Sequence, residues 1–230
     1  MAISSRATAF WYFAMEHKIT AIKAQKKNPN RVNVYLDGEY AFSLARIVAA
    51  WLHVEQVLTD QKIEMLKKQD GEEKAFQRAL VMAGYRSRSE REIHKKLETI
   101  GYPAELIERV LARLRQAEVL NDERFAREWV ENRSVFRPRS RRMMAAELRF
   151  KGISEEVIQN TVEKSEEDKK LAYDAARKRA HRLENLSWEE FRKKMSGYLG
   201  RRGFSYQTIS IVVRQVWSEF QAERATNLHE

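Results

Sequence analysis

Arginine is concentrated in the middle of this 230-residue chain, and the chemistry it offers is the recognition of anions. A guanidinium presents its donors in a planar fork that fits a carboxylate or a phosphate in a bidentate arrangement. Between residues 133 and 151, seven cations and one carboxylate, Glu147, give a net charge of +6. The cations are Arg133, Arg137, Arg139, Arg141, Arg142, Arg149 and Lys151. We expect them to contact an anionic partner, with Phe136 stacking on a base or filling a partner pocket; the alternative is a solvated face.

Two further groups of cations are weaker candidates for the same chemistry. The first begins with Arg177, Lys178, Arg179 and Arg182 and continues in residues 192–194 and 201–202. We expect either contact with DNA phosphates or a face that keeps the chain in solution. The second consists of Arg86 and Arg88 beside Glu90, where pairing along a helix is the alternative to partner contact.

Catalytic and metal-binding chemistry finds little support in the sequence. The histidines are scattered and lack the spacing of metal ligands: His17, His53, His94, His181 and His229. There is no cysteine, which excludes disulfides, thiolate zinc sites and thiol nucleophiles. No glycine-rich phosphate loop and no apolar run of about 20 residues is present. We therefore predict a cytoplasmic, non-enzymatic protein without cofactor, metal or membrane partner, and its net charge of +10 favours a polyanionic partner.

The elements that must position these cations begin with a small β-structure. Val32, Val34 and Leu36 alternate with polar residues, which is typical of a strand, and Asp37-Gly38 is a strong signal for a hairpin turn. We predict a hairpin of two or three strands over residues 18–43, with residues 1–17 as an N-terminal tail. From Leu44 onward the pattern favours helix: Leu44, Ile47, Val48, Trp51 and Leu52 would share one helical face.

An internal repeat organises the rest of the chain. Four positions recur twice at an interval of 51 residues: Leu97, Gly101, Tyr102 and Ile107, then Leu148, Gly152, Ile153 and Ile158, then Leu199, Gly203, Phe204 and Ile209. Leucine ends a helix, glycine adopts a left-handed conformation just beyond it, and Pro103, Ser154 or Ser205 starts the next helix. Ser89 with Glu92 and Ser187 with Glu190 form capping boxes upstream.

These observations predict a mainly α fold, a tandem array of three three-helix repeats preceded by a small β-hairpin and helix. The predicted segments are 18–72 for the hairpin with helices, 73–121, 122–165 and 166–221 for the repeats, and 222–230 for a C-terminal tail. Phe125 and Trp129, four residues apart, are predicted to lie in the core of the second repeat rather than in a ligand site.

The order and spacing of the motifs resemble the RecX family over about residues 18–221. Residues 86–93 with Gly101-Tyr102 resemble the family's first repeat. Residues 121–126 resemble its D-x-x-F-A motif, and residues 147–153 its E-L-x-x-K-G-I motif. The chain departs from the family in two places: the stretch from Ser134 to Pro138 lacks a glycine often found there, and residues 1–17 have no counterpart.

The resemblance implies a function. RecX proteins bind the RecA filament on single-stranded DNA, lodge in its groove, and suppress ATP hydrolysis and strand exchange, which tempers recombination and the SOS response. We expect the same of this chain, acting as a monomer.

The alternative function is direct, sequence-neutral DNA binding, with one repeat acting as a helix-turn-helix. The second helices of the repeats are acidic, with Glu105, Glu108, Glu155, Glu156 and Glu163, which disfavours insertion into a groove lined by phosphates. Weak direct contact with nucleic acid is still expected from the charge, and an RNA-binding solenoid stays open as a third class.

Overall fold

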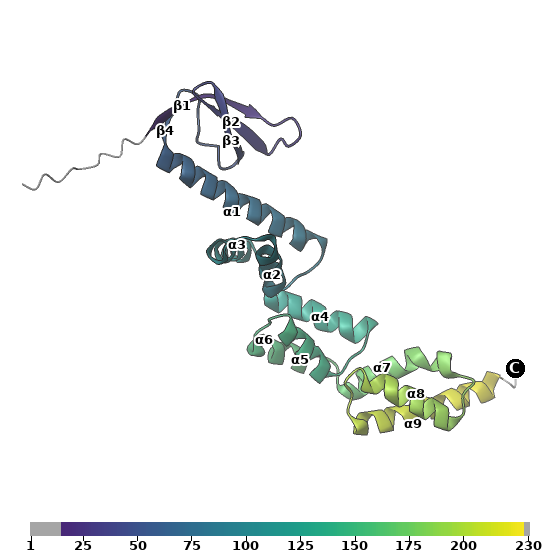
Figure 1. Ribbon diagram of the computed structural model, residues 1–230. Helices are drawn as coiled ribbons and strands as arrows, with labels where there is room; N and C mark the ends of the chain where they lie inside the picture. Colours follow the sequence, from purple (N-terminus) through teal and green to yellow (C-terminus); the bar gives the residue numbers. More distant parts are fainter. Residues whose placement is uncertain (1–14, 228–230) are drawn as a thin grey trace, which may run out of the picture. The chain divides into compact units, whose positions relative to one another are not determined.

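The computed structural model describes residues 15–227 (Figure 1). Its residues form two compact units: the first contains residues up to 82 together with 97–114, and the second contains residues 83–96 and 115 onward. The predicted N-terminal tail lies outside the described residues up to position 14, whereas Glu16 and His17 already belong to the first strand.

The first unit contains a four-stranded antiparallel sheet. Its strands are β1 (Glu16–Ala24), β2 (Arg31–Leu36), β3 (Glu39–Ala45) and β4 (Val57–Thr59), in the order β3-β2-β1-β4. The predicted hairpin is confirmed: β2 and β3 pair through Asp37 and Gly38, both with positive φ. The buried side chains of β2 meet Ile63 and Leu66 of helix α1 (Asp60–Tyr85) in one hydrophobic core.

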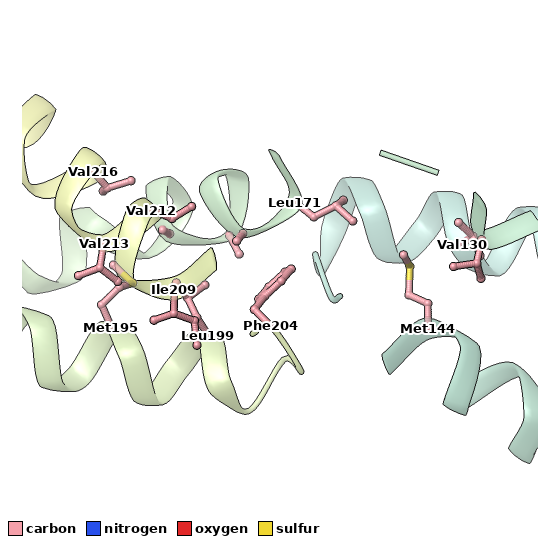
Figure 2. Packing of buried hydrophobic residues seen from close by; sticks show 14 of the residues in the cluster. Val130, Met144, Leu171, Met195, Leu199, Phe204, Ile209, Val212, Val213 and Val216 are labelled. Atoms are coloured by element: carbon pink, nitrogen blue, oxygen red, sulfur yellow. The ribbon is translucent and has the colours of Figure 1, made fainter. Parts of the chain in front are cut away.

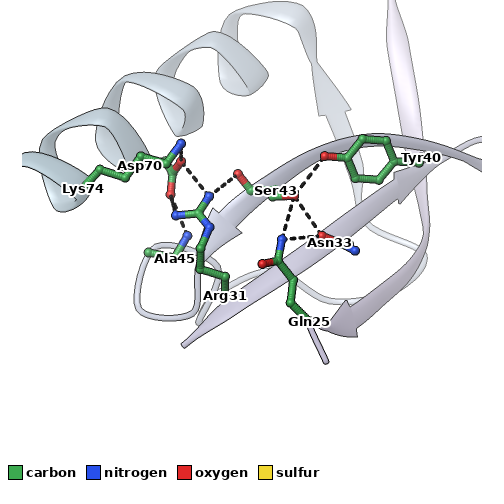
Figure 3. A network of polar contacts seen from close by, with 8 residues as sticks. All are labelled: Gln25, Arg31, Asn33, Tyr40, Ser43, Ala45, Asp70 and Lys74. Carbon is green, nitrogen blue, oxygen red and sulfur yellow. Dashed lines mark hydrogen bonds and ion pairs between the residues drawn. The ribbon is translucent and has the colours of Figure 1, made fainter. Parts of the chain in front are cut away.

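The predicted helix over residues 44–52 is wrong. Leu44 lies in β3, which ends at Ala45; the chain then turns, and Ile47 and Trp51 are 62% and 89% exposed instead of sharing a buried face. The physical reason is a polar network around Asp70 of α1, shown in Figure 3. The Asp70 carboxylate accepts hydrogen bonds from the Ala45 amide at 2.6 Å and from both terminal nitrogens of Arg31 at 3.1 Å. This fixes the end of β3 against α1, at a position 25 residues away in sequence that local periodicity does not reveal.

Helices make up the remainder of the chain. They are α2 (Glu90–Ile100), α3 (Ala104–Gln116), α4 (Asp122–Phe136), α5 (Arg141–Phe150), α6 (Glu155–Glu163), α7 (Asp168–Ala180), α8 (Trp188–Gly200) and α9 (Tyr206–Asn227). A 3₁₀ turn, His181–Leu183, follows α7. Helix α9 continues into the segment predicted as a C-terminal tail, and α4 continues through Phe136.

The 51-residue repeat corresponds to a recurring helix end. Gly101, Gly152 and Gly203 have φ of +97°, +85° and +86°, as predicted for left-handed positions just past α2, α5 and α8. The residue after the first two glycines bonds back to the leucine carbonyl: Tyr102 to Leu97 at 3.2 Å and Ile153 to Leu148 at 3.1 Å. This is the six-to-one bond of a Schellman motif. The tandem array of three-helix repeats is therefore present in the structure.

One hydrophobic core runs through α4–α9 of the second unit (Figure 2). Val130 and Met144 belong to its α4–α5 part, and Met195 and Leu199 to its α8 part. The prediction that Phe125 and Trp129 are core residues is confirmed: Phe125 is buried, Trp129 packs on the core, and their ring centroids are 5.7 Å apart.

The repeat glycines differ in what surrounds them, which yields a first prediction. A Cβ at Gly101 would meet no heavy atom within 4 Å among the described residues, whereas one at Gly203 would lie 2.6 Å from Ser140 Oγ and 2.9 Å from Met143 Cβ. We expect Gly101→Ala to lower the free energy of unfolding by about 1 kcal/mol through φ alone. Gly203→Ala should cost about 1–3 kcal/mol more through overlap. Urea denaturation measures both, and equal losses would show that the close approach contributes nothing.

Candidate anion-binding interface

Two junctions between consecutive repeats carry most of the candidate cations. At the first junction, the Ser89 hydroxyl, which caps α2, donates to the carbonyl oxygen of Lys151 at the end of α5, 2.7 Å away. The first amide of α2, that of Glu90, donates to Asp122 Oδ1 at 2.9 Å. The unsatisfied amides at a helix N-terminus therefore find their acceptors in the following repeat.

The second junction has a similar arrangement: Ser140, Arg141 and Arg202 lie 51 residues after their counterparts, and Asp168 lies 46 residues after Asp122. The Ser140 amide donates to the carbonyl oxygen of Arg202 at 3.0 Å, and the Arg141 amide donates to Asp168 Oδ1 at 2.8 Å. Asp122 and Asp168 are each the first residue of the first helix in their repeat. The aspartate of the D-x-x-F-A motif is thus a cap for a helix of the preceding repeat, a role that its spacing in the sequence does not indicate.

A partly buried carboxylate neutralises the cations of the first junction. Glu92 accepts hydrogen bonds from Lys151 Nζ at 2.6 Å and from the Arg86 guanidinium at 3.1 and 3.2 Å. Burial favours the neutral acid, but the bonds from Arg86 and Lys151 outweigh it and hold the pKa of Glu92 at about 2. Arg86 and Lys151 therefore have a structural role, and Arg88 also has a partner within the protein.

Glu147 forms ion pairs with two more of the predicted cations, Arg133 and Arg139. Its carboxylate accepts from Trp129 Nε1 and Arg133 Nε, both at 2.8 Å, and also pairs with Arg139. The Arg133 side chain is only 16% exposed and stacks on the Trp129 ring, 4.2 Å from its centroid. The single carboxylate of the arginine-rich stretch thus serves as the centre of an internal network.

Arg141 and Arg149 are also engaged within the chain. The Arg141 guanidinium donates to the carbonyl oxygens of Glu163, Ser165 and Glu166, where it caps the C-terminal end of α6. Arg149 forms a two-point ion pair with Glu155, in which Nε donates at 2.8 Å. Five of the seven cations therefore have acceptors within the chain, and contact of the seven with an anionic partner stays a prediction.

Two of the seven, Arg137 and Arg142, are exposed and have no hydrogen-bond or ion-pair partner among the described residues. They flank the short connection between α4 and α5, next to Phe136, whose side chain is 71% exposed. We call Phe136, Arg137 and Arg142 the α4–α5 surface. It combines two available guanidiniums with an aromatic ring, and can offer both charge-assisted hydrogen bonds and stacking.

Three cations of the second group also have partners within the chain. Arg177 pairs with Glu223 at 2.8 Å, and Lys178 donates to the carbonyl oxygen of Val135. Arg179 lies over the Tyr198 ring, 5.4 Å from its centroid, and Arg202 packs on the same ring at 3.8 Å. Tyr198 carries no charge, so a search for cations does not find it, yet it is what brings these two guanidiniums together.

Other chemistries are not indicated by the part of the chain that the structure describes. Its His, Asp and Glu side chains nowhere gather in threes in a way that could hold a metal ion. Among the same residues, no helix has both the length and the apolar character needed to cross a bilayer.

Three capped three-helix repeats, which follow a small antiparallel sheet in the chain, define a helical-repeat protein. Four family models match in order: the regulatory protein RecX N-terminal domain at residues 17–59, and the first, second and third RecX three-helix domains at 75–114, 121–162 and 166–213. The chain belongs to the RecX family.

Individual relatives agree with this assignment. Regulatory protein RecX of Bacillus subtilis is 30% identical over 86% of this chain and 76% of its own length. The Clostridium acetobutylicum protein of the same name is also 30% identical, over 89% of this chain and 98% of its own. A crystal structure of regulatory protein RecX superposes with a TM-score of 0.69 at 29% identity, covering 85% of this chain and 98% of that one.

The pKa of Glu92 yields a second prediction. Because the folded pKa is about 2 and the ordinary value is 4.5, the ionised carboxylate stabilises the fold above pH 4.5, and this contribution is lost as the pH falls toward 2. The shift corresponds to at most about 3 kcal/mol. We expect Glu92→Gln to be less stable than the parent at pH 7, with the difference vanishing near pH 2. Denaturation at several pH values measures this. A constant difference across the range would contradict the assigned role.

Proposed function

We propose that this protein is a non-enzymatic cytoplasmic regulator that binds the RecA filament on single-stranded DNA and inhibits its ATPase and strand exchange. It would thereby temper recombination and the SOS response, and it would act as a monomer. Family membership supports a regulatory role, since the relatives bear the name regulatory protein RecX. The RecA partner follows from the resemblance of the repeats to that family.

The α4–α5 surface is the observation that carries the proposal. Arg137 and Arg142 are exposed and have no partner in the described part of the chain, whereas Arg133, Arg139 and Arg141 are held by acceptors of this chain. A hydrogen bond to a charged group contributes about 1.5–3 kcal/mol when it forms in a desolvated contact. Two such arginines beside an exposed Phe136 match the composition of binding hot spots, in which arginine and aromatic residues are enriched.

Direct, sequence-neutral contact with nucleic acid is retained as a second activity. Sequence-specific reading through the second helices is disfavoured, because Glu155, Glu156 and Glu163 are all exposed on α6. Glu105 and Glu108 are likewise exposed on α3. Carboxylates on a recognition helix would be repelled by the phosphates that line the groove.

The experiment is inhibition of RecA's single-stranded-DNA-dependent ATPase by the purified protein and by Arg137→Glu with Arg142→Glu. We expect the double variant to raise the half-inhibitory concentration at least tenfold, since a loss of about 1.4 kcal/mol already gives that factor. Its melting temperature should stay close to that of the parent, because exposed arginines contribute under about 1 kcal/mol each to stability.

A matched control separates a local contact from net charge. Lys26→Glu with Lys27→Glu makes the same charge change at two exposed residues of the β1–β2 connection. This control should inhibit RecA as well as the parent does. Equal loss in both variants would assign the effect to net charge. Full inhibition by the Arg137/Arg142 variant would remove the α4–α5 surface from the contact, and inactivity of the parent protein on RecA would overturn the function itself.

A further inference from the structure

The two junctions match position by position, with one substitution that changes their electrostatics. The pairs, each 51 residues apart, are Ser89 and Ser140, Arg86 and Arg137, Lys151 and Arg202, and Gly152 and Gly203. Glu92, the carboxylate that neutralises the first junction, corresponds to Met143 in the second. The second junction therefore keeps the cations and lacks the anion.

The consequence is visible at Arg202. Its Nε is a buried polar atom without a hydrogen-bond partner, the one such side-chain atom found in the described part of the chain. Burial lowers the pKa of Arg202; Tyr198 opposes this shift, and the positive charges of Arg139, Arg179 and Arg201 add to it. A buried donor without an acceptor is unfavourable, so a ligand that supplies the acceptor recovers free energy.

No carboxylate among residues 15–227 is hydrogen-bonded to this Nε. Glu147, the carboxylate of the second repeat's network, is already shared by Trp129, Arg133 and Arg139. Glu190 borders the neighbouring hollow, but its carboxylate accepts from the amide and the hydroxyl of Ser187 in the capping box of α8.

A hollow of about 470 Å³ lies on α7 and α8. Tyr198 and Arg179 line it, and Arg202 adjoins it by packing on the Tyr198 ring. Four cations line it, Arg179, Lys193, Lys194 and Arg201, against the single carboxylate of Glu190. In the first junction one carboxylate suffices for two cations. The larger excess of positive charge here favours a ligand with several negative charges in succession, such as the phosphates of a nucleic-acid strand.

We propose that the second junction is a phosphate-binding site, in which Arg202 and Arg179 hold one backbone phosphate of a single-stranded nucleic acid and Lys193 and Lys194 receive the next. The phosphate supplies Arg202 with an anionic acceptor, as Glu92 does for Lys151 in the first junction. This proposal rests on the direct contact with nucleic acid proposed above as a second activity, and not on RecA.

The test restores the missing carboxylate. Met143→Glu should pair with Arg202 as Glu92 pairs with Lys151, and it should lower affinity for a fluorescein-labelled oligothymidylate at least tenfold, measured by anisotropy at low salt without RecA. Met143→Gln, which is similar in size and neutral, should bind like the parent. Gln159→Glu adds the same charge at an exposed position of α6 and should also bind like the parent. Unchanged affinity in folded Met143→Glu would overturn the site, as would an equal loss in Gln159→Glu.

A second variant keeps the proposal testable if Met143→Glu does not fold. Arg202→Met should weaken binding and reduce the log–log salt slope by about 0.7, the value for one phosphate contact on a single strand. An unchanged slope would overturn the assignment. Two further probes decide the source of the anion. If polyglutamate binds and oligothymidylate does not, the site takes protein carboxylates. If inorganic phosphate raises the melting temperature while oligothymidylate leaves it unchanged, the site takes free phosphate, and either result overturns the strand-binding proposal.

Discussion

The architecture of the second unit depends on one contact, the seating of a serine-capped helix N-terminus on the glycine-ended helix of the following repeat. The chain brings Ser89 against the residues preceding Gly152, and Ser140 against those preceding Gly203. Glycine meets two requirements there, a positive φ and the absence of a side chain in the contact. Gly101 has no preceding repeat, so it meets only the requirement for a positive φ. The same residue type therefore serves different physical purposes along one array.

The same contact sets the electrostatics of the junctions. Bringing an N-terminus against a neighbouring helix buries amides that need acceptors, and Asp122 and Asp168 supply them. Burial raises the pKa of Asp122, whereas the hydrogen bond from the Glu90 amide and the charge of Arg115 lower it, and burial has the larger effect. Desolvation of the carboxylate therefore offsets part of the stability that the capping hydrogen bond contributes. The contact also gathers the cations near each helix end into one place, where a carboxylate either neutralises them or is absent.

Sequence alone predicted the repeat well and the arginine roles only partly. The 51-residue interval located Gly101, Gly152 and Gly203, because helix ends depend on local backbone conformation that residue type encodes. The turn after β3 and the acceptors of Arg141 escaped prediction, because both depend on groups distant in sequence, the Asp70 carboxylate in one case and backbone carbonyls in the other. A count of charged residues does not include a carbonyl oxygen, so it does not show which arginines already have acceptors within the chain.

Comparison of the junctions shows how one side chain alters the charge balance of a repeated contact. Glu92 and Met143 occupy the same position, and replacing the carboxylate with a thioether leaves the fold's hydrogen bonds through Ser140 and Arg141 in place. What changes is the balance of charge: Lys151 has an internal counterion, whereas Arg202 has cations as neighbours and an unused donor. Such a site has a cost to the free protein, because uncompensated like charges repel one another. An anion that binds there removes the repulsion. The free energy of this relief then contributes to binding.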